Sequence, residues 1–308
     1  MRNIRSTCAF LLAACLSFAT SAGAESAHHQ EPIIDVVFDL DDTLIRWVRP
    51  DEAKSGTLIP AMSQGKPYLF RVLDGTPEIL ESLSRQPGVR ISFFSMGERS
   101  RNETVLSQLK LPSGRTAREI AYRVLSLEDA TQVNGESHKD LRLVNPDLER
   151  VLIVDDQKNA PIPGQERNVL WLGGKPEHFY ESLHDTPGSG ATWKPASPEK
   201  FVEYRNRLAY ARGLIDRVLT ESKKSGSIGV VEALAAQQWS RDSAGLPVFR
   251  SGLRSDLSLY RKGAAEFHAV NSRYGFTTAY TGPERRACLS EAISEFLKIP
   301  YVERRVKR

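Results

Sequence analysis

The stretch Ile33-Ile34-Asp35-Val36-Val37-Phe38-Asp39-Leu40-Asp41-Asp42-Thr43-Leu44 decides the fold, because it is an apolar run that ends in closely spaced acids. The run predicts a buried strand. A strand sends alternate side chains to opposite faces, but at its carboxyl end the chain turns. Asp39 and Asp41 can then converge on one phosphoryl group and one metal ion. A magnesium-dependent aspartyl phosphotransferase needs this arrangement.

Apolar runs alternate with amphipathic stretches up to about residue 185, as a doubly wound sheet requires. A helix signal, Thr76-Pro77-Glu78, leads into Ile79 and Leu80, with Thr76 as cap and Pro77 at the first helical position. A second helix is expected from about residue 100 to 110, before Pro112. The expected strands are Ile33–Phe38, Val89–Phe94, Tyr122–Leu125, Val151–Val154 and Asn168–Leu172.

The composition changes in the segment 184–198, which contains Thr186-Pro187-Gly188-Ser189-Gly190 and is typical of a linker. Beyond it the pattern is helical. Apolar residues recur at helical spacing from Phe201 to Leu219, and further helices are expected at 230–239, 257–270 and 283–297. No catalytic signature is present in this part.

The first 24 residues predict a targeting segment. Met1–Arg5 carries two arginines and no acid, residues 8–19 are largely apolar, and Ala22-Gly23-Ala24 is a small-residue cleavage pattern. The apolar part is too short for a membrane-spanning helix. An alternative is that Leu12-Ala13-Ala14-Cys15 resembles a lipobox, which would place a lipid anchor on Cys15. In both cases we expect an exported protein, either periplasmic or secreted.

Charge and cysteine content exclude several classes of protein. Removing the leader lowers the formal net charge from +4 to +2, and no cluster of basic residues and aromatics indicates a nucleic-acid surface. Cys288 then remains alone, so an internal disulfide is excluded. The histidines show no zinc-ligand spacing, and His138 is interpreted as a neighbour of Lys139 at the rim of a site.

Polar residues follow the other expected strands in a definite order. Ser95 comes directly after Ile91-Ser92-Phe93-Phe94, Lys139 lies in His138-Lys139-Asp140-Leu141, and Val151-Leu152-Ile153-Val154 ends in Asp155-Asp156. The carboxyl ends of strands are where an open α/β sheet binds ligands. Ser92 or Ser100 takes the role of Ser95 if the strand ends elsewhere.

These motifs resemble, in order, those of the haloacid dehalogenase superfamily of phosphatases: Asp-x-Asp-x-Thr, a Ser or Thr, a Lys and a terminal acidic pair. Lys139-Asp140-Leu141 followed by the strand to Asp155 is similar to the NLI-interacting-factor branch, which includes small phosphatases of the RNA polymerase C-terminal domain. Asp156-Gln157-Lys158 departs from the Asn-Ser-Pro of many members. The resemblance implies a mostly parallel Rossmann-like α/β sheet with a minimal cap. The expected segments are a signal peptide (1–24), a phosphatase domain (25–185), a linker (186–198) and a smaller helical domain (199–308).

The resemblance also implies a role for each residue. Asp39 is the expected nucleophile and Asp41 the general acid and base, while Ser95 and Lys139 bind the substrate phosphate. Mg²⁺ is the expected cofactor, with Asp39, the backbone carbonyl of Asp41, Asp155 and Asp156 at the metal site. The acid at Asp41 favours phosphoester hydrolysis, since dehalogenases of the superfamily lack it.

Three functions remain open. The first is hydrolysis of a phosphorylated protein, because the only insertion after the first motif, 49–70, is short. The second is a broad-specificity periplasmic acid phosphatase for small phosphomonoesters. The third is a secreted binding module on the same scaffold, for which Arg285, Arg286 and the basic tail Arg304, Arg305, Lys307 and Arg308 offer a contact surface.

Overall fold

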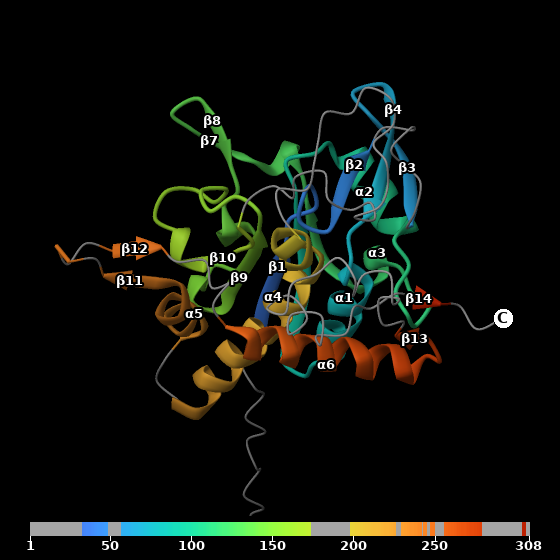
Figure 1. Ribbon diagram of the computed structural model, residues 1–308. Helices are drawn as coiled ribbons and strands as arrows, with labels where there is room; N and C mark the ends of the chain where they lie inside the picture. Colours follow the sequence, from blue (N-terminus) through green and yellow to red (C-terminus); the bar gives the residue numbers. More distant parts are fainter. Residues whose placement is uncertain are drawn as a thin grey trace, which may run out of the picture. The chain divides into compact units, whose positions relative to one another are not determined.

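The molecule is built around a parallel sheet of five strands in the order β10-β9-β1-β5-β6 (Figure 1). The computed structural model describes residues 33–48, 57–173, 198–225, 229–241, 243–244, 247–249, 256–278 and 304–305. The strands are β1 (Ile34–Phe38), β5 (Val89–Phe94), β6 (Ala121–Leu125), β9 (Val151–Asp155) and β10 (Val169–Trp171). The predicted α/β fold and its strands are confirmed.

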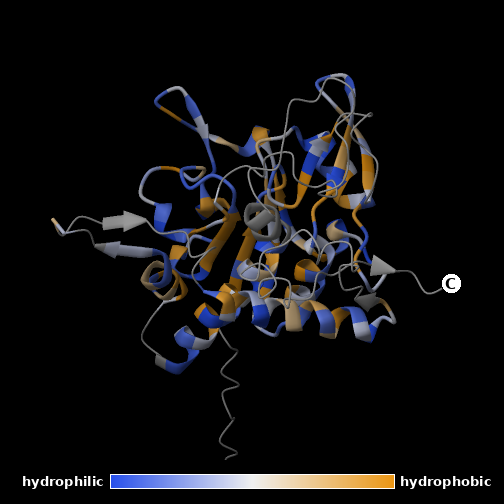
Figure 2. Ribbon diagram, viewed as in Figure 1, coloured by the Kyte–Doolittle hydropathy of each residue, from blue (hydrophilic) through white to orange (hydrophobic). Residues whose placement is uncertain are grey.

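Strand β1 occupies the centre of this sheet, and all five of its residues are buried. Val37 pairs in parallel with Ser92 on one side and with Ile153 on the other. Figure 2 shows the strands of the sheet as hydrophobic. Because the strands are parallel, their carboxyl ends meet at one edge, which therefore carries the residues that follow β1, β5 and β9.

The buried acid in β1 is satisfied within the sheet. Asp35 accepts two hydrogen bonds from Arg90, at 2.9 and 2.7 Å, and a third from Asn145 at 2.8 Å. The guanidinium of Arg90 also lies 3.9 Å from the ring centroid of Tyr122. A charge that is paired in this way can be tolerated in a core strand.

Helix α1 (Thr76–Ser84) has Gly75 as its N-cap, so the prediction of Thr76 as the cap is wrong. Gly75 is left-handed (φ 83°), and a Cβ at this position would lie 2.7 Å from the ring of Phe267. Thr76 instead donates its hydroxyl to the carbonyl of Leu44 at 2.9 Å. Thr76 therefore ties α1 to the turn that follows β1.

The remaining elements of the first half are short. Helix α2 spans Arg99–Gln108, slightly earlier than predicted, and α3 spans Ala117–Ile120. The segment interpreted as an insertion, 49–70, contributes β3 and most of β4 to an antiparallel sheet in the order β2-β4-β3. Its strands are β2 (Ile45–Val48), β3 (Leu58–Ser63) and β4 (Lys66–Val72). Strands β7 (Thr131–Val133) and β8 (Glu136–His138) form a hairpin. Short 3-10 helices complete this half of the chain: η1 (Leu127–Asp129), η2 (Leu141–Leu143), η3 (Leu148–Arg150) and η4 (Glu166–Asn168).

Beyond residue 197 the described chain is mainly helical, as predicted. It comprises α4 (Pro198–Ser225), α5 (Val230–Gln238) and α6 (Leu257–Arg273), with short pairs β11 (Trp239–Arg241) and β12 (Pro247–Phe249), and β13 (Thr277–Thr278) and β14 (Arg304–Arg305). The leader, the linker up to residue 197 and the predicted helix at 283–297 lie outside the described residues. No helix in the described part of the chain has a stretch long and apolar enough to cross a membrane.

Helices α4 and α6 pack so closely that their backbones are in contact at two glycines. A Cβ on Gly213 would lie 2.0 Å from the carbonyl oxygen of Leu259, and one on Gly263 would lie 1.8 Å from that of Ala209. Helix α6 runs alongside α4 and α1 (Figure 1). One continuous apolar core contains residues of the central sheet together with residues of α1, α4, α5 and α6.

Candidate active site

Asp39 lies directly after β1, and its carboxylate is almost buried (side chain 7% exposed). Its backbone N–H donates to the carbonyl of Val154 at 3.0 Å, which continues the parallel pairing by one residue. The ammonium of Lys139 donates to Oδ1 of Asp39 at 2.7 Å and to Oδ2 of Asp155 at 2.8 Å. One buried cation therefore bridges the acids that end two neighbouring strands.

The charges of Asp39, Asp155 and Lys139 shift the pKa values within this cluster. Burial raises the pKa of Asp39 well above its usual range, Lys139 opposes this rise, and the carboxylates of Asp155 and Asp41 add to it. Burial alone would lower the pKa of Lys139, but Asp155 and Asp39 more than offset burial and raise that pKa above its ordinary value. Lys139 therefore stays charged and holds Asp39 in place.

Lys139 is positioned by the loop that follows β9. Its backbone N–H donates to the carbonyl of Ala160 at 3.0 Å, and its own carbonyl accepts from Ile162 at 3.0 Å. The neighbouring Asp140 accepts from the side chain of Gln165 at 2.9 Å. These hydrogen bonds explain why Lys139, which follows no strand of the central sheet, still reaches the edge of that sheet.

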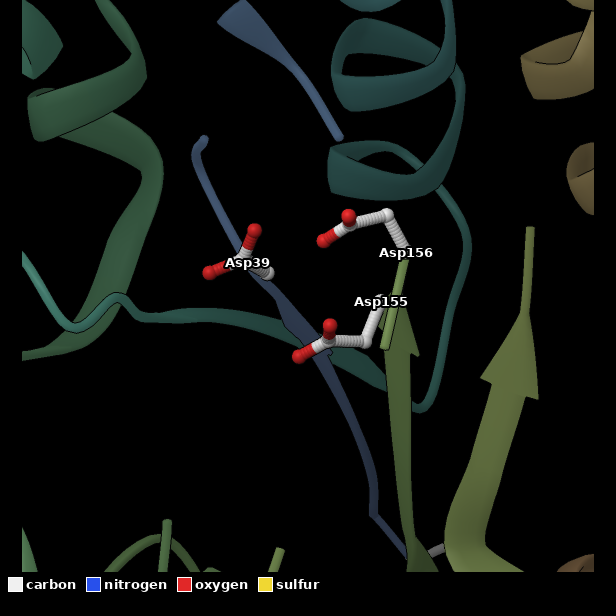
Figure 3. A group of neighbouring side chains, drawn as sticks. All are labelled: Asp39, Asp155 and Asp156. Carbon is white, nitrogen blue, oxygen red and sulfur yellow. The ribbon is translucent and has the colours of Figure 1, made fainter. Parts of the chain in front are cut away.

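Asp155 ends β9 and Asp156 follows it, and both face the carboxylate of Asp39 (Figure 3). Asp155 also accepts from the backbone N–H of Gln157 at 2.8 Å. The backbone N–H of Asp156 donates to the hydroxyl of Thr43 at 3.1 Å, and its carbonyl accepts from the indole of Trp171 at 2.8 Å. Asp156 is thus fixed through its backbone, whereas Asp155 is held through its carboxylate by Lys139 and Gln157.

The donor set at this edge fits a divalent cation. Asp39, Asp155 and Asp156 each offer a carboxylate oxygen, and these oxygens lie within 4.8 Å of one another. Oδ2 of Asp156 is buried and has no hydrogen-bond partner among the described residues. Burial, then the charges of Asp155 and Asp42, raises the pKa of Asp156 to about 7. Three carboxylates and the single ammonium of Lys139 leave an excess of two negative charges when all are ionised, which a divalent cation would neutralise.

Asp41 has different surroundings from Asp39. Its side chain is 42% exposed, and both carboxylate oxygens accept from the guanidinium of Arg101 at 2.6 Å. Ser95 donates its hydroxyl to Oδ2 of Asp41 at 3.0 Å and accepts from Arg101 at 2.9 Å. Because both donors act together, the carboxylate is held in one orientation at the mouth of the site.

Arg101 is the residue that the sequence analysis missed. It lies on α2, is buried, and is itself held by Oδ1 of Asn102 at 3.0 and 2.6 Å. Its guanidinium also lies 5.4 Å from the ring centroid of Phe70. A Cβ on Gly97 would lie only 1.8 Å from Nη2 of Arg101, so Gly97 makes room for it. The one available signal was this glycine, two residues after Ser95.

The alternatives to Ser95 lie elsewhere. Ser92 is buried within β5, and its hydroxyl has no partner among the described residues. Ser100 is exposed on α2. His138 lies in β8 with Nε2 3.7 Å from Glu136, beside Lys139 in the chain. Ser95 is thus the serine of the three that contacts Asp41.

Residues 34–173 match the model of one protein family, the NLI interacting factor-like phosphatases. Two solved structures are similar to this chain. One is Fcp1, an essential RNA polymerase II CTD phosphatase, at 15% identity and a TM-score of 0.38, covering 79% of this chain and 63% of that chain. The other is fission yeast Fcp1 bound to beryllium fluoride, at 18% identity and a TM-score of 0.38, covering 79% of this chain and 66% of that chain. The chain therefore spans less than two thirds of either Fcp1 chain. No curated protein sequence matches.

Proposed function

We propose that this chain, whose residues 34–173 match the model of the NLI interacting factor-like phosphatases, is a member of that family and a magnesium-dependent phosphomonoester hydrolase. The observation that carries the proposal is the pair of bonds from Lys139 to Asp39 and Asp155, at 2.7 and 2.8 Å. They hold a carboxylate nucleophile against a cation at the ligand-binding edge of the sheet.

Asp39 acts as the nucleophile. One of its carboxylate oxygens attacks the phosphorus in line, a bond from Asp39 to phosphorus forms, and the bond from phosphorus to the leaving oxygen breaks. Lys139 restrains the carboxylate and compensates the charge that the phosphoryl group brings. A buried and fixed nucleophile needs no reorientation at the moment of attack.

Asp41 acts as the general acid and base. In the first step it gives a proton to the leaving oxygen, and in the second it takes a proton from the water that hydrolyses the aspartyl phosphate on Asp39. Its side chain is 42% exposed, so it lies where a leaving group and water arrive. Ser95 and Arg101 orient it, and Ser95, together with Lys139, would donate to a phosphoryl oxygen when the substrate is bound.

Asp39, the backbone carbonyl of Asp41, Asp155 and Asp156 would hold Mg²⁺. When bound there, Mg²⁺ would supply positive charge to the phosphoryl oxygens. The buried Oδ2 of Asp156 and the raised pKa of that residue support this assignment.

The substrate that we propose is a phosphorylated protein. An open cleft of about 280 Å³ lies between the β3–β4 strands and α2, the helix that carries Arg101. Its lining is largely apolar and includes the exposed Met62. A cleft of this kind, lined in part by the helix that carries Arg101, suits a side chain of a peptide substrate. We also propose export, on the strength of the leader pattern in residues 1–24.

Hydrolysis of an aryl phosphate by the purified full chain, with and without Mg²⁺, tests this function. We expect turnover that requires Mg²⁺ and is lost in Asp39→Asn. The matched control is Asp147→Asn, which changes an exposed carboxylate outside the site and should retain activity. Absence of turnover by the wild type across pH values and phosphoesters would favour the binding module instead.

A phosphoserine peptide panel tests the substrate class. Met62→Asp should lower kcat/KM for a phosphopeptide with an apolar flanking residue and leave aryl phosphate hydrolysis unchanged. Equal effects of Met62→Asp on both substrates, or no effect on either, would point to a small phosphomonoester as the substrate.

Mass spectrometry of the exported chain tests the proposed leader. We expect a new N-terminus after Ala24, whereas a lipid on Cys15 would show that the chain is lipid-anchored instead.

A further inference from the structure

Arg207 reaches the turn that carries the two carboxylates, although it comes from α4 and lies outside the family-matched residues. It is among the largest fully buried side chains of the described residues, at 1% exposure. Its guanidinium donates through Nη2 to the carbonyl of Asp42 and lies 3.5 Å from the carbonyl of Thr43. A cation from the helical part thus contacts the backbone of the turn after Asp41.

This turn links the components of the candidate active site. The carbonyl of Leu40 accepts from Leu44 and Ile45, each at 2.9 Å, so the chain reverses within a few residues of Asp39. Asp42 adopts a left-handed backbone conformation (φ 56°), which is uncommon for a residue other than glycine. Such a conformation persists only where the surroundings hold it. Thr43 accepts from the backbone N–H of Asp156, which connects the turn to the acid pair.

The part of α4 next to Arg207 is firmly attached. The Cβ of the following residue, Leu208, packs beside Gly75. The next turns of the helix approach the backbone of α6 at Gly213, and Arg212 donates to the hydroxyl of Ser82 on α1 at 2.7 Å. Arg207 is therefore held next to the turn by a helix that packs against both α1 and α6.

We propose that Arg207 is a positioning residue of the phosphatase, and that α4 thereby completes an active site whose other components lie within residues 34–173. The inference rests on the proposed function of Asp39 and Asp41. Arg207 contacts the backbone of the turn at the carbonyls of Asp42 and Thr43. It acts by fixing the carbonyls of Asp42 and Thr43, so that Asp41 and the backbone N–H of Asp156 keep their places.

The test compares Arg207→Met and Arg207→Lys with Arg212→Met in the full chain. Met keeps the apolar stem and removes the donors, whereas Lys restores one cationic donor. Arg212 is a matched control because it is buried on the same helix but bonds to Ser82 and Glu266, away from the turn. If Arg207→Met does not fold, Arg207→Gln replaces it.

Two readouts separate positioning from general stability. For Arg207→Met we expect kcat to fall by about tenfold or more with KM changed little, since the geometry of the reacting groups is affected rather than binding. Arg207→Lys should recover part of the loss. Hydrogen exchange of the backbone of residues 40–45 should become faster in Arg207→Met and stay unchanged in Arg212→Met.

Unchanged kcat and unchanged exchange in a folded Arg207 variant would overturn the proposal. Equal losses in the Arg207 and Arg212 variants would also overturn it, because they would show a structural role only. If the wild type has no turnover, the proposed phosphatase function fails, while hydrogen exchange still decides whether Arg207 holds the turn.

Discussion

Two acids of one short motif have opposite environments. Asp39 is buried and bonded to Lys139, whereas Asp41 is partly exposed and bonded to Ser95 and Arg101. The division follows from the end of β1: Asp39 still pairs with the sheet, and by Asp41 the chain has begun to turn. Such a pair can divide the work of nucleophile and proton carrier without further specialisation.

Arg101 gives the first prediction. Arg101→Met retains a long side chain but removes both hydrogen bonds to Asp41. Bonds to a charged group contribute about 1.5–3 kcal/mol, so we expect kcat to fall by about 10- to 100-fold. Steady-state kinetics with an aryl phosphate measures this. Arg99→Met, on the same helix but exposed and paired with Asp129, should stay within about twofold of wild type. An equal loss in both variants would contradict a specific role.

Asp156 gives a prediction on pH. Its pKa rises from the ordinary value of 3.8 to about 7 in the folded chain, so between these values the folded state binds more protons than the unfolded state. This carboxyl therefore costs stability as pH rises through that window. In metal-free buffer, the melting temperature of Asp156→Asn relative to wild type should increase from about pH 4.5 to about pH 8.

Adding Mg²⁺ should raise the melting temperature of the wild type at about pH 8 more than that of Asp156→Asn. The control for both measurements is the exposed Asp147→Asn, whose difference from wild type should not follow this pattern. A difference between Asp156→Asn and wild type that is independent of pH would contradict the linkage.

At the scale of elements, the strands were predictable because their signal is local. Apolar runs marked β1, β5 and β9, and the polar residues after them mark the ligand-binding edge. Arg101 and Arg207 were not predictable in the same way. An arginine on a helix is usually exposed, and only the fold brings α2 and α4 to the turn after β1.

The antiparallel β2-β4-β3 sheet was missed for a related reason. The segment 49–70 was interpreted only as an insertion, because its apolar run Leu58–Met62 is interrupted by Pro60, a residue disfavoured inside a strand. Thr76 was assigned as a cap from its residue type, but the close contact of Gly75 with Phe267, a residue almost two hundred positions away, decides the local geometry. Long-range packing thus overrides the local signal.

The close packing of α4 on α6 predicts that a larger residue at the contact lowers the stability of the protein. Gly263→Ala would place a methyl group 1.8 Å from the carbonyl oxygen of Ala209, so the helices must separate. Overpacking of this kind costs about 1–3 kcal/mol, and the melting temperature measured by circular dichroism should fall by several degrees. Arg261→Ala, exposed on the same helix, is the control and should change it little. A Gly263→Ala protein as stable as wild type would show that the helices do not meet there.

At the scale of the whole molecule, one apolar core joins the central sheet to the helical part. Leu208 and Phe267 from the helical part belong to the same buried cluster as Ile79 and Leu80 of α1. A chain that stops after the sheet would therefore expose apolar surface that the helices now cover.

A truncation tests this at the molecular scale. A chain that ends at residue 185 should aggregate or melt without a cooperative transition, whereas one that ends at residue 278 retains α4, α5 and α6 and should melt cooperatively. Gel filtration and circular dichroism measure both outcomes. A soluble, cooperatively melting chain ending at 185 would show that the sheet is stable without the helices.

The indole of Trp171, at the end of β10, donates to the carbonyl of Asp156. Indole fluorescence responds to hydrogen bonding and local polarity, so Trp171 is an intrinsic fluorescent probe of the acid pair. The chain has four tryptophans, and replacing Trp47, Trp193 and Trp239 by Phe would leave Trp171 as the sole emitter. Arrival of a cation or a phosphoryl group beside Asp156 would then be visible in real time, without an attached dye.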